Sequence, residues 1–269
     1  MRFLFIWLAL WASALSAASR LVVLDVGEGQ AVLLQQGGRG VLFDTGHPGR
    51  VRNLLDRLRD LGVSHLDHVI LTHLHPDHAG GYFRLREAFP RTPVYWNGQP
   101  LPKDVRPDMV RWVDEALRSD GRSQVLRAGG SIGWEGWQIR VLWPGAFSSG
   151  DLNRHSLVLL IERDRTRILI MGDAEAGAER ALLNRGRLPQ GVDVLVVGHH
   201  GAADATTEDF LRQVQPARAV ISVNAGNIRG YPSAGVIQRL AALGIPLQRT
   251  DQEGDVVIEF PLRGVPGEP

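Results

Sequence analysis

The chain has 269 residues, with 30 lysine and arginine residues against 29 aspartate and glutamate residues and a formal net charge of +1. Its hydrophobic fraction of 44% and charged fraction of 22% are those of an ordinary globular protein, which excludes disordered, collagen-like and coiled-coil chains. The absence of cysteine excludes disulfides, thiolate nucleophiles and cysteine-ligated metal sites. A net charge near zero excludes a uniformly basic nucleic-acid binder, but it allows a local basic face.

Residues 1–19 have the pattern of a secretory signal peptide. A single positive charge precedes the apolar run 3–11, and small residues fill 12–19. These are the three parts of an export signal, and the apolar run is too short to span a bilayer comfortably. We therefore expect cleavage after one of the small residues and an exported chain, periplasmic or secreted, with no integral membrane domain after cleavage. An uncleaved amino-terminal anchor is the alternative.

Beyond residue 19, short apolar runs alternate with turn residues through one expected domain, 20–263, and a Pro/Gly-rich tail, 264–269, is expected to fray. Strands are predicted at 21–26, 31–34, 41–44, 69–72, 94–96, 138–142, 157–161, 168–171, 194–197, 219–223 and 256–260. Helices are predicted at 51–61, 108–118, 175–184, 207–214 and 233–243, with 98–122 as an insertion. This order favours an α+β fold in which sheet packs on sheet with helices outside.

The most informative segment is His73-Leu74-His75-Pro76-Asp77-His78, which carries four potential metal ligands in six residues. It follows the apolar strand predicted at 69–72. A strand end is a rigid base, and the loop after it lets several side chains converge on a cation. Imidazole and carboxylate ligands together suit zinc, manganese or iron. The alternative is a solvated polar loop that happens to be rich in histidine.

Other polar residues also follow predicted buried strands. Asp44 follows 41–43, Asp173 follows 168–172, and His199 and His200 follow 194–198. Sheet proteins commonly place active-site groups at the ends of buried strands. Each residue alone is weak support, since an aspartate after a strand is usually a turn residue or a helix cap. With the histidine-rich segment they form a convergent set.

Together these segments resemble the metallo-β-lactamase fold superfamily over roughly 20–261, and more finely the hydrolase domain of ComEC-type competence proteins. The finer resemblance rests on Asp25-Val26-Gly27-Glu28-Gly29-Gln30-Ala31, where the family reads Asp-Val-Gly-Gln-Gly-Asp-Ala, and on the segments 153–159, 197–201 and 250–255. It implies a four-layer αββα sandwich. It also implies two divalent cations, zinc or alternatively manganese.

The resemblance implies a role for each ligand. His73 and His75 would bind the first cation, Asp77, His78 and His199 would bind the second, and Asp173 would bridge both. Asp44, and with it Asp25, would support the ligands without binding metal. His155 is the candidate for a third ligand of the first cation, and a surface histidine near the cleft is the alternative.

Catalytic and substrate-binding residues follow from the same resemblance. Asp77 is also a candidate proton acceptor, and His200 is a candidate to reach toward the substrate. The candidate substrate-binding residues are Asn153, Ser156, Asn227 and Tyr231. Tyr231 stands where the family carries histidine in Asn-x-Tyr-Gly-His-Pro, which bears on substrate identity. His47, just after Asp44-Thr45-Gly46, could face the cleft.

The expected function is that of an exported metal-dependent hydrolase, a phosphodiesterase or nuclease with a two-metal-activated water and DNA as its possible substrate. In the superfamily that this chain resembles, a carboxylate that bridges both metals is the pattern of members that act on phosphodiesters or thioesters, and it counts against a β-lactamase. An exported β-lactamase-type or other ester or amide hydrolase is one alternative. A non-catalytic DNA-binding module on the same fold is the other. The sequence leaves the physiological substrate and the oligomeric state open.

Overall fold

A computed structural model describes residues 18–148 and 150–261 of the chain. Within them the strands form two seven-stranded sheets. The first contains, in spatial order, β14 (Val256–Phe260), β1 (Ser19–Val23), β2 (Val32–Gln36), β3 (Arg39–Phe43), β4 (His65–Leu71), β5 (Val94–Trp96) and β6 (Ser123–Val125). The second contains β13 (Leu247–Arg249), β12 (Ala219–Ile221), β11 (Val194–Val196), β10 (Thr166–Ile170), β9 (Val158–Arg163), β8 (Trp137–Trp143) and β7 (Ser131–Trp134).

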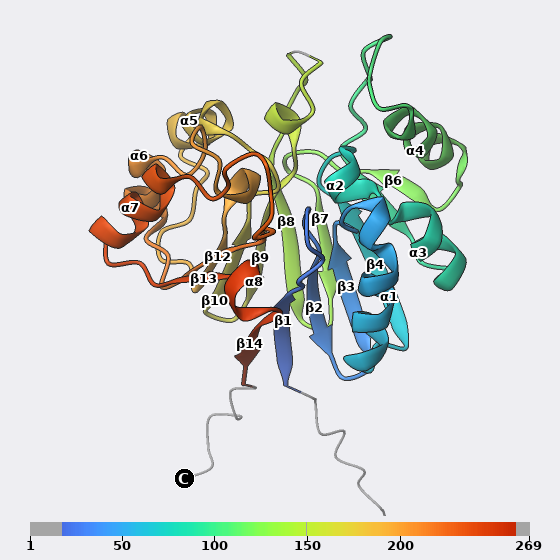
Figure 1. Ribbon diagram of the computed structural model, residues 1–269, viewed down its shortest axis with the longest axis horizontal. Coiled ribbons are helices and arrows are strands. Elements are labelled where there is room, and N and C mark those ends of the chain that lie inside the picture. The colour runs from blue at the N-terminus through green and yellow to red at the C-terminus, as the bar shows by residue number, and fades with distance from the viewer. Residues whose placement is uncertain (1–17, 149, 262–269) are drawn as a thin grey trace, which may run out of the picture.

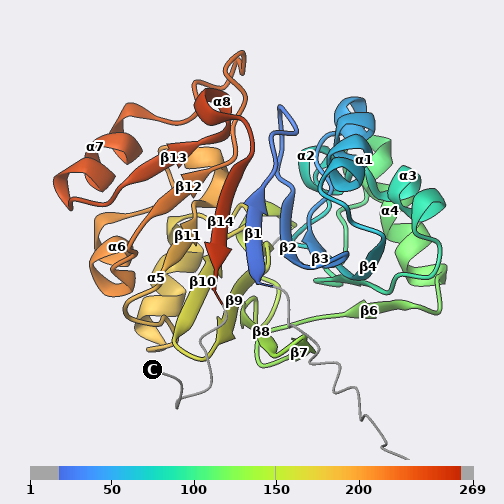
Figure 2. The ribbon, with the colours of Figure 1, turned by 90° about the horizontal axis from the view of Figure 1, so that it is seen from below.

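Helices cover the outer face of each sheet, as Figures 1 and 2 show. The first sheet carries α1 (Val51–Asp60), α2 (Pro76–Ala79), α3 (Tyr82–Ala88) and α4 (Asp108–Ser119). The second carries α5 (Ala176–Asn184), α6 (Glu208–Val214) and α7 (Ala234–Ala242), while α8 (Thr250–Glu253) precedes β14. Short 3₁₀ turns form η1 (Pro48–Arg50), η2 (Asn153–His155) and η3 (Gly198–Gly201). The predicted αββα sandwich is confirmed.

Alternate residues of the central strands face the two sides of each sheet, and both sides are dry. In β10, Ile168 and Ile170 pack between the sheets, whereas Leu169 packs under the outer helices. In β2, Leu34 faces the inter-sheet core and Leu33 faces the helices. Strands covered on both faces have continuous apolar runs, and these runs made the central strands predictable from the sequence.

Two strands that the sequence did not predict lie at sheet edges. Each of β6 and β13 is the last strand at one edge of its sheet, and none of their residues is fully buried. An edge strand with little burial needs no apolar run, so it leaves no hydrophobic pattern. The short helix α3 buries only Tyr82 and Leu85, which is too few positions to show a helical period.

The parallel pairs of strands determine where the polar strand ends meet. β3 pairs parallel with β4, and β10 pairs parallel with β11. Because parallel strands end at the same edge, Asp44 lies beside the segment that follows β4, and its backbone N–H donates to the Ile70 carbonyl. In the same way Asp173 and the turn η3 lie together after β10 and β11. Each sheet therefore presents its polar strand ends at one edge.

The termini bear on two of the expectations. Residues 1–17 of the predicted signal peptide and the tail 264–269 lie outside the described residues. Ser19 is buried in β1 and pairs with Gln36 and Phe260, so the predicted signal boundary at residue 19 overlaps the first strand by one residue. Across the described ranges we find no helix with the length and apolarity needed to cross a bilayer.

Gly29 holds the turn between β1 and β2 against the histidine-rich segment. Its φ is +111°, and a Cβ at this position would lie 2.1 Å from the Asp77 carbonyl oxygen. Gly62, which follows α1, also has a positive φ of +74°, but a Cβ there would meet nothing within 4 Å. Both glycines therefore have a backbone conformation that strains an L side chain, but a side chain would clash with a neighbour only at Gly29.

We expect Gly62→Ala to cost about 1–2 kcal/mol of unfolding free energy, from the positive φ alone. Gly29→Ala should cost about 1–3 kcal/mol more, because Asp77 must also move. Chemical denaturation of both variants measures the difference. Equal costs would show that the contact between Gly29 and Asp77 does not constrain the fold.

Candidate metal centre

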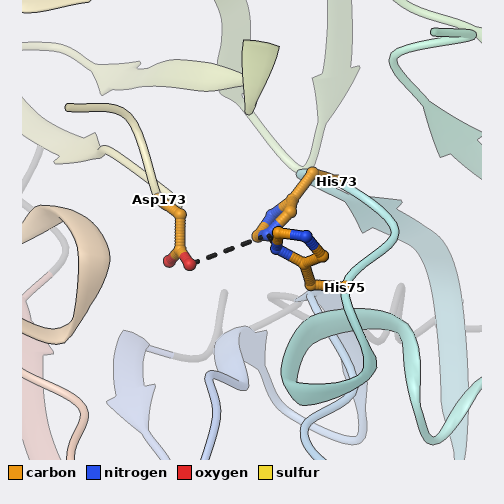
Figure 3. A group of neighbouring side chains, drawn as sticks. All are labelled: His73, His75 and Asp173. Carbon is orange, nitrogen blue, oxygen red and sulfur yellow. Dashed lines mark hydrogen bonds and ion pairs between the residues drawn. The ribbon is translucent and has the colours of Figure 1, made fainter. Parts of the chain in front are cut away.

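Two groups of imidazole and carboxylate side chains meet where strands of both sheets end. The first group is His73, His75 and Asp173, whose possible ligand atoms all lie within 4.8 Å of one another. His73 Nε2 is 3.0 Å from His75 Nδ1 and 3.7 Å from Asp173 Oδ2. Figure 3 shows the two rings and the carboxylate pointing at one another across the gap between the two sheets. His73 and Asp173 are almost entirely buried.

The second group is Asp77, His78 and His200, with ligand atoms within the same 4.8 Å limit. His78 Nε2 lies 3.2 Å from His200 Nε2, and His200 Nε2 lies 3.8 Å from Asp77 Oδ2. All three side chains are buried. Asp77 and His78 come from helix α2, whereas His200 comes from η3 of the opposite sheet.

Asp173 belongs to both groups. Its Oδ2 faces His73, while its Oδ1 lies 2.9 Å from His78 Nε2 and 3.6 Å from His200 Nε2. Its backbone N–H donates to the Ser156 hydroxyl at 3.0 Å. Asp173 Oδ1 is a buried atom with no hydrogen bond of acceptable geometry. One carboxylate thus presents one oxygen to each group.

The donor set fits divalent cations. In each group two imidazole nitrogens face each other at 3.0 and 3.2 Å, so at most one nitrogen of each pair carries a proton. Two nitrogens that share a zinc ion, each about 2.0–2.1 Å from it, stand roughly 3.4 Å apart in tetrahedral geometry. Imidazole with carboxylate is a ligand set for zinc and manganese. His73 and His75 with Asp173 would hold one cation, and Asp77, His78 and His200 with Asp173 the other.

Asp44 fixes the orientation of the His78 ring by contacting Nδ1, the nitrogen that faces away from the second group. Its carboxylate lies 2.8 Å from His78 Nδ1 and accepts hydrogen bonds from the Thr72 N–H, the Thr72 hydroxyl and the Gln30 amide. A proton held on Nδ1 leaves the lone pair of Nε2 directed at the group. The Ser222 carbonyl does the same for His200, since it lies 2.8 Å from Nδ1 of that ring.

The carboxylates and histidines strongly perturb one another. Burial disfavours the charged form of His78, but Asp173 and Asp44 outweigh burial and hold the pKa of His78 well above its usual value. Burial likewise opposes ionisation of Asp173, yet His78 and His200 hold its pKa well below the usual range. Burial and the neighbouring His78 lower the pKa of His73. A cation entering the site must therefore displace a proton from His78, so we expect the affinity for metal to fall as the pH falls.

Comparison with known proteins agrees with this geometry. A profile of the metallo-beta-lactamase superfamily matches residues 24–225. The chain belongs to the metallo-β-lactamase superfamily. It is 31% identical over 244 residues to "Recombination protein 2" of Haemophilus influenzae, covering 88% of this chain and 28% of that protein. It is 31% identical over 236 residues to "Competence protein ComA" of Neisseria gonorrhoeae, covering 86% of this chain and 31% of that protein.

Solved structures support the fold. The metallo-beta-lactamase fold protein YhfI of Bacillus subtilis superposes with a TM-score of 0.60 and 12% identity, covering 90% of this chain and all of that one. The chain spans less than a third of the length of the two curated relatives named above. It is a metallo-β-lactamase fold protein related to the recombination and competence proteins named above over most of its own length.

The structure corrects three expectations about histidines. His200, not His199, completes the second group, and His200 is therefore directed at the ligands rather than toward a substrate. Both residues have left-handed backbone angles, with φ of 50° and 52°, so their side chains do not alternate as in an extended segment. His155 joins neither group, because Nδ1 lies 3.0 Å from the Asp151 carbonyl and Nε2 accepts from the Ser148 N–H at 3.1 Å.

Several supporting and substrate-binding expectations also change. Asp25 accepts from the Gly27 N–H within its own turn and, among the described residues, makes no hydrogen bond or ion pair to either group. Ser156 is fully buried and holds Asp173 instead of facing a substrate. Asn227 is occupied within its loop, where it accepts from the Tyr231 N–H and donates to two carbonyls. The ring of Tyr231 stacks near His200, with centroids 6.4 Å apart.

A cavity of about 330 Å³ opens beside the two groups. It reaches His75 and Asp77, and its other polar lining residues are Glu28, His47, Arg106, Asn153 and Arg229. His47 and Asn153 thus lie at the cleft, where the sequence suggested them. Arg229 lies 3.5 Å from Asp77 Oδ2 and 3.7 Å from Glu28 Oε1. No sequence motif distinguishes Arg229 from the other arginines of this chain, so its place at the cleft was not predicted.

Asp44→Asn should weaken metal binding at the second group by about 10–100-fold, because the amide cannot hold the proton on His78 Nδ1 as a carboxylate does. Competition with a chromophoric chelator in alkaline buffer measures the affinity where protons compete least. Asp67→Asn is the matched control, since Asp67 pairs with Arg39 and Trp134 away from the site. Equal affinities in Asp44→Asn and wild type would contradict the role of Asp44.

Proposed function

We propose that this chain is an exported hydrolase that holds two divalent cations, zinc or manganese, and cleaves phosphodiesters, with DNA as the substrate class. The observation that carries the proposal is the buried carboxylate of Asp173, which presents one oxygen to each of two histidine-containing groups. Two-metal sites suit the displacement of an alkoxide from a phosphodiester, because both the attacking and the leaving oxygen need stabilisation.

The chain's own groups prepare the site for this chemistry. When bound, a pair of divalent cations supplies an acidified water and positive charge for the transition state. Asp44 and the Ser222 carbonyl hold two imidazole rings in the tautomer that a ligand requires. Asp77 is nine-tenths buried at the cavity wall, and burial and Asp173 oppose its ionisation while His78 and His200 keep its pKa low. Asp77 is therefore an ionised carboxylate, as a metal ligand must be. We propose it as a proton acceptor as well, because it lies at the cavity wall.

Two arginines favour a phosphate over a neutral substrate. Arg106 and Arg229 line the same cavity as His75 and Asp77. Among the residues that the structure describes, the ion pairs of Arg229 are only long ones, at 3.5 and 3.7 Å, and 48% of its side chain is exposed. A guanidinium that is close to the site but not tightly paired can turn to a phosphate and bind it through two hydrogen bonds. The relatives named for recombination and competence support a nucleic acid as the source of that phosphate.

The test of the activity is hydrolysis of bis(p-nitrophenyl) phosphate and of single-stranded DNA by purified chain supplied with Zn²⁺ or Mn²⁺. We expect turnover with at least one metal, and a loss of about 100-fold or more in His75→Ala, equal to several kcal/mol of transition-state stabilisation. His65→Ala is the control, because His65 is exposed at the start of β4.

Full activity in His75→Ala would refute a metal-dependent phosphodiesterase. Turnover of nitrocefin without turnover of phosphodiesters would favour the β-lactamase alternative. Binding of DNA with no turnover of any substrate would favour the non-catalytic binding module.

Removal of the Arg229 side chain tests the phosphate-binding role. We expect Arg229→Ala to raise KM for a phosphodiester about 10-fold or more with a smaller change in kcat, because a charged hydrogen bond contributes about 1.5–3 kcal/mol. Arg229→Lys should recover part of the loss. Arg212→Ala, on the exposed face of α6, is the control. An unchanged KM in Arg229→Ala would eliminate this arginine as a phosphate ligand.

The export proposal rests on the amino-terminal pattern of charge, apolar run and small residues. A fusion of residues 1–19 to a reporter enzyme that is active only outside the cytoplasm should show activity. The same fusion with two arginines placed within the apolar run 3–11 should be inactive. If the reporter fused to the unaltered residues 1–19 remains inactive, the export proposal is refuted.

A further inference from the structure

A third group of potential ligands lies next to the two described above. Glu175, His199 and Asp204 place one ligand atom each within 4.8 Å of one another. Glu175 precedes α5, His199 belongs to η3, and Asp204 lies between η3 and α6. We propose that these three residues form a third divalent-cation site, separate from the pair of sites bridged by Asp173.

The strongest indication is an unsatisfied nitrogen. His199 is 8% exposed, and its Nδ1 is a buried atom with no hydrogen-bond partner. A buried polar atom without a partner costs about 1–3 kcal/mol, so such an atom calls for an explanation. Nδ1 of His199 points between the two carboxylates, with Asp204 Oδ1 at 3.4 Å and Glu175 Oε1 at 3.7 Å.

These distances favour a cation over a direct ion pair. A protonated imidazole normally donates to a carboxylate at about 2.7–2.9 Å. Both carboxylate oxygens lie farther from Nδ1 than that. Ligands bound about 2.0–2.2 Å from one tetrahedral ion are separated by roughly 3.4 Å. The two distances from Nδ1 are therefore close to those between ligands of a shared cation, and the third pair, Glu175 and Asp204, lies within 4.8 Å.

The charge around the group also lacks compensation. Among the described residues, the ion pairs of Glu175 and Asp204 involve only His199, and neither carboxylate pairs with an arginine or a lysine. The chain carries 30 arginine and lysine residues, so a cluster of carboxylates without a cationic side chain is a local exception. A bound cation would neutralise it.

The site is accessible and adjoins the cleft. Asp204 is 60% exposed, which gives an ion and its water ligands a path from solvent. On its other edge, His199 Nε2 contacts the side-chain amide of Asn153 at 3.1 Å. A ring that binds a cation through Nδ1 carries its proton on Nε2, so the amide oxygen of Asn153 then faces this nitrogen and accepts the hydrogen bond. Asn153 also lines the cavity beside His75. One imidazole with two carboxylates suits Mn²⁺ or Zn²⁺. A cation there would hold η3 and add positive charge at the rim of the cavity.

Equilibrium dialysis against Mn²⁺, followed by elemental analysis, tests the proposal without reference to catalysis. We expect wild-type chain at saturation to bind one equivalent more than Asp204→Asn, and Glu175→Gln to match Asp204→Asn. Asp209→Asn, on the exposed first turn of α6, should bind as much as wild type. The one-equivalent difference is the criterion, so the result does not depend on whether the chain proves to be a phosphodiesterase.

Asp204 is exposed, so its substitution should leave the fold intact, and thermal unfolding of the metal-free variant checks this. If Glu175→Gln does not fold, Asp204→Asn decides the question alone. Equal Mn²⁺ stoichiometry and affinity in wild type and a folded Asp204→Asn would overturn the third site. A loss of the same size in Asp209→Asn would also overturn it, because the effect would then reflect general surface charge.

Discussion

The structure of the site depends on one buried carboxylate. Asp173 is 2% exposed and lies among the imidazoles of His73, His78 and His200. An ionised carboxylate in that position would be strongly disfavoured by burial if positive charge did not surround it. The two sheets contribute the partners from opposite sides, because His78, whose pKa is held well above its usual value, follows β4 whereas Asp173 follows β10 of the second sheet. The attraction between these side chains therefore also holds the two sheets of the sandwich together at this edge.

This balance explains why so many neighbours are themselves constrained. Asp44 satisfies one side of His78, Ser156 anchors the backbone of Asp173, and the close approach of Gly29 fixes the backbone of Asp77. Each contact removes a degree of freedom from a ligand. A preorganised set of ligands binds a cation without a large cost in side-chain ordering, whereas a flexible set would lose that advantage.

The site residues that could be predicted from the sequence are those whose signal lies in neighbouring residues of the chain. The segment 73–78 has its ligands adjacent along the chain, and continuous apolar runs identified the central strands that support them. Asp44 and Asp173 were predictable because each directly follows such a run. The choice between His199 and His200 depended instead on two consecutive left-handed residues, which no pattern in His199-His200-Gly201 reveals. His155 was misassigned because the backbone groups that engage its ring belong to residues with no distinguishing signal, and Arg229 reaches the site only through the path of its loop.

The pairing of the first and last strands has a consequence for how this domain can be joined to others. Ser19 lies opposite Phe260 in the register of β1 and β14, and it also pairs with Gln36, which lies opposite the first residue of β3. The metal ligands follow the far ends of the strands, so both ends of the described fold lie on the side away from them (Figure 1). Neighbouring termini on a surface remote from the active centre are the arrangement in which a domain tolerates insertion into a larger polypeptide. A partner domain attached at either end would lie away from the two groups of histidine and carboxylate side chains.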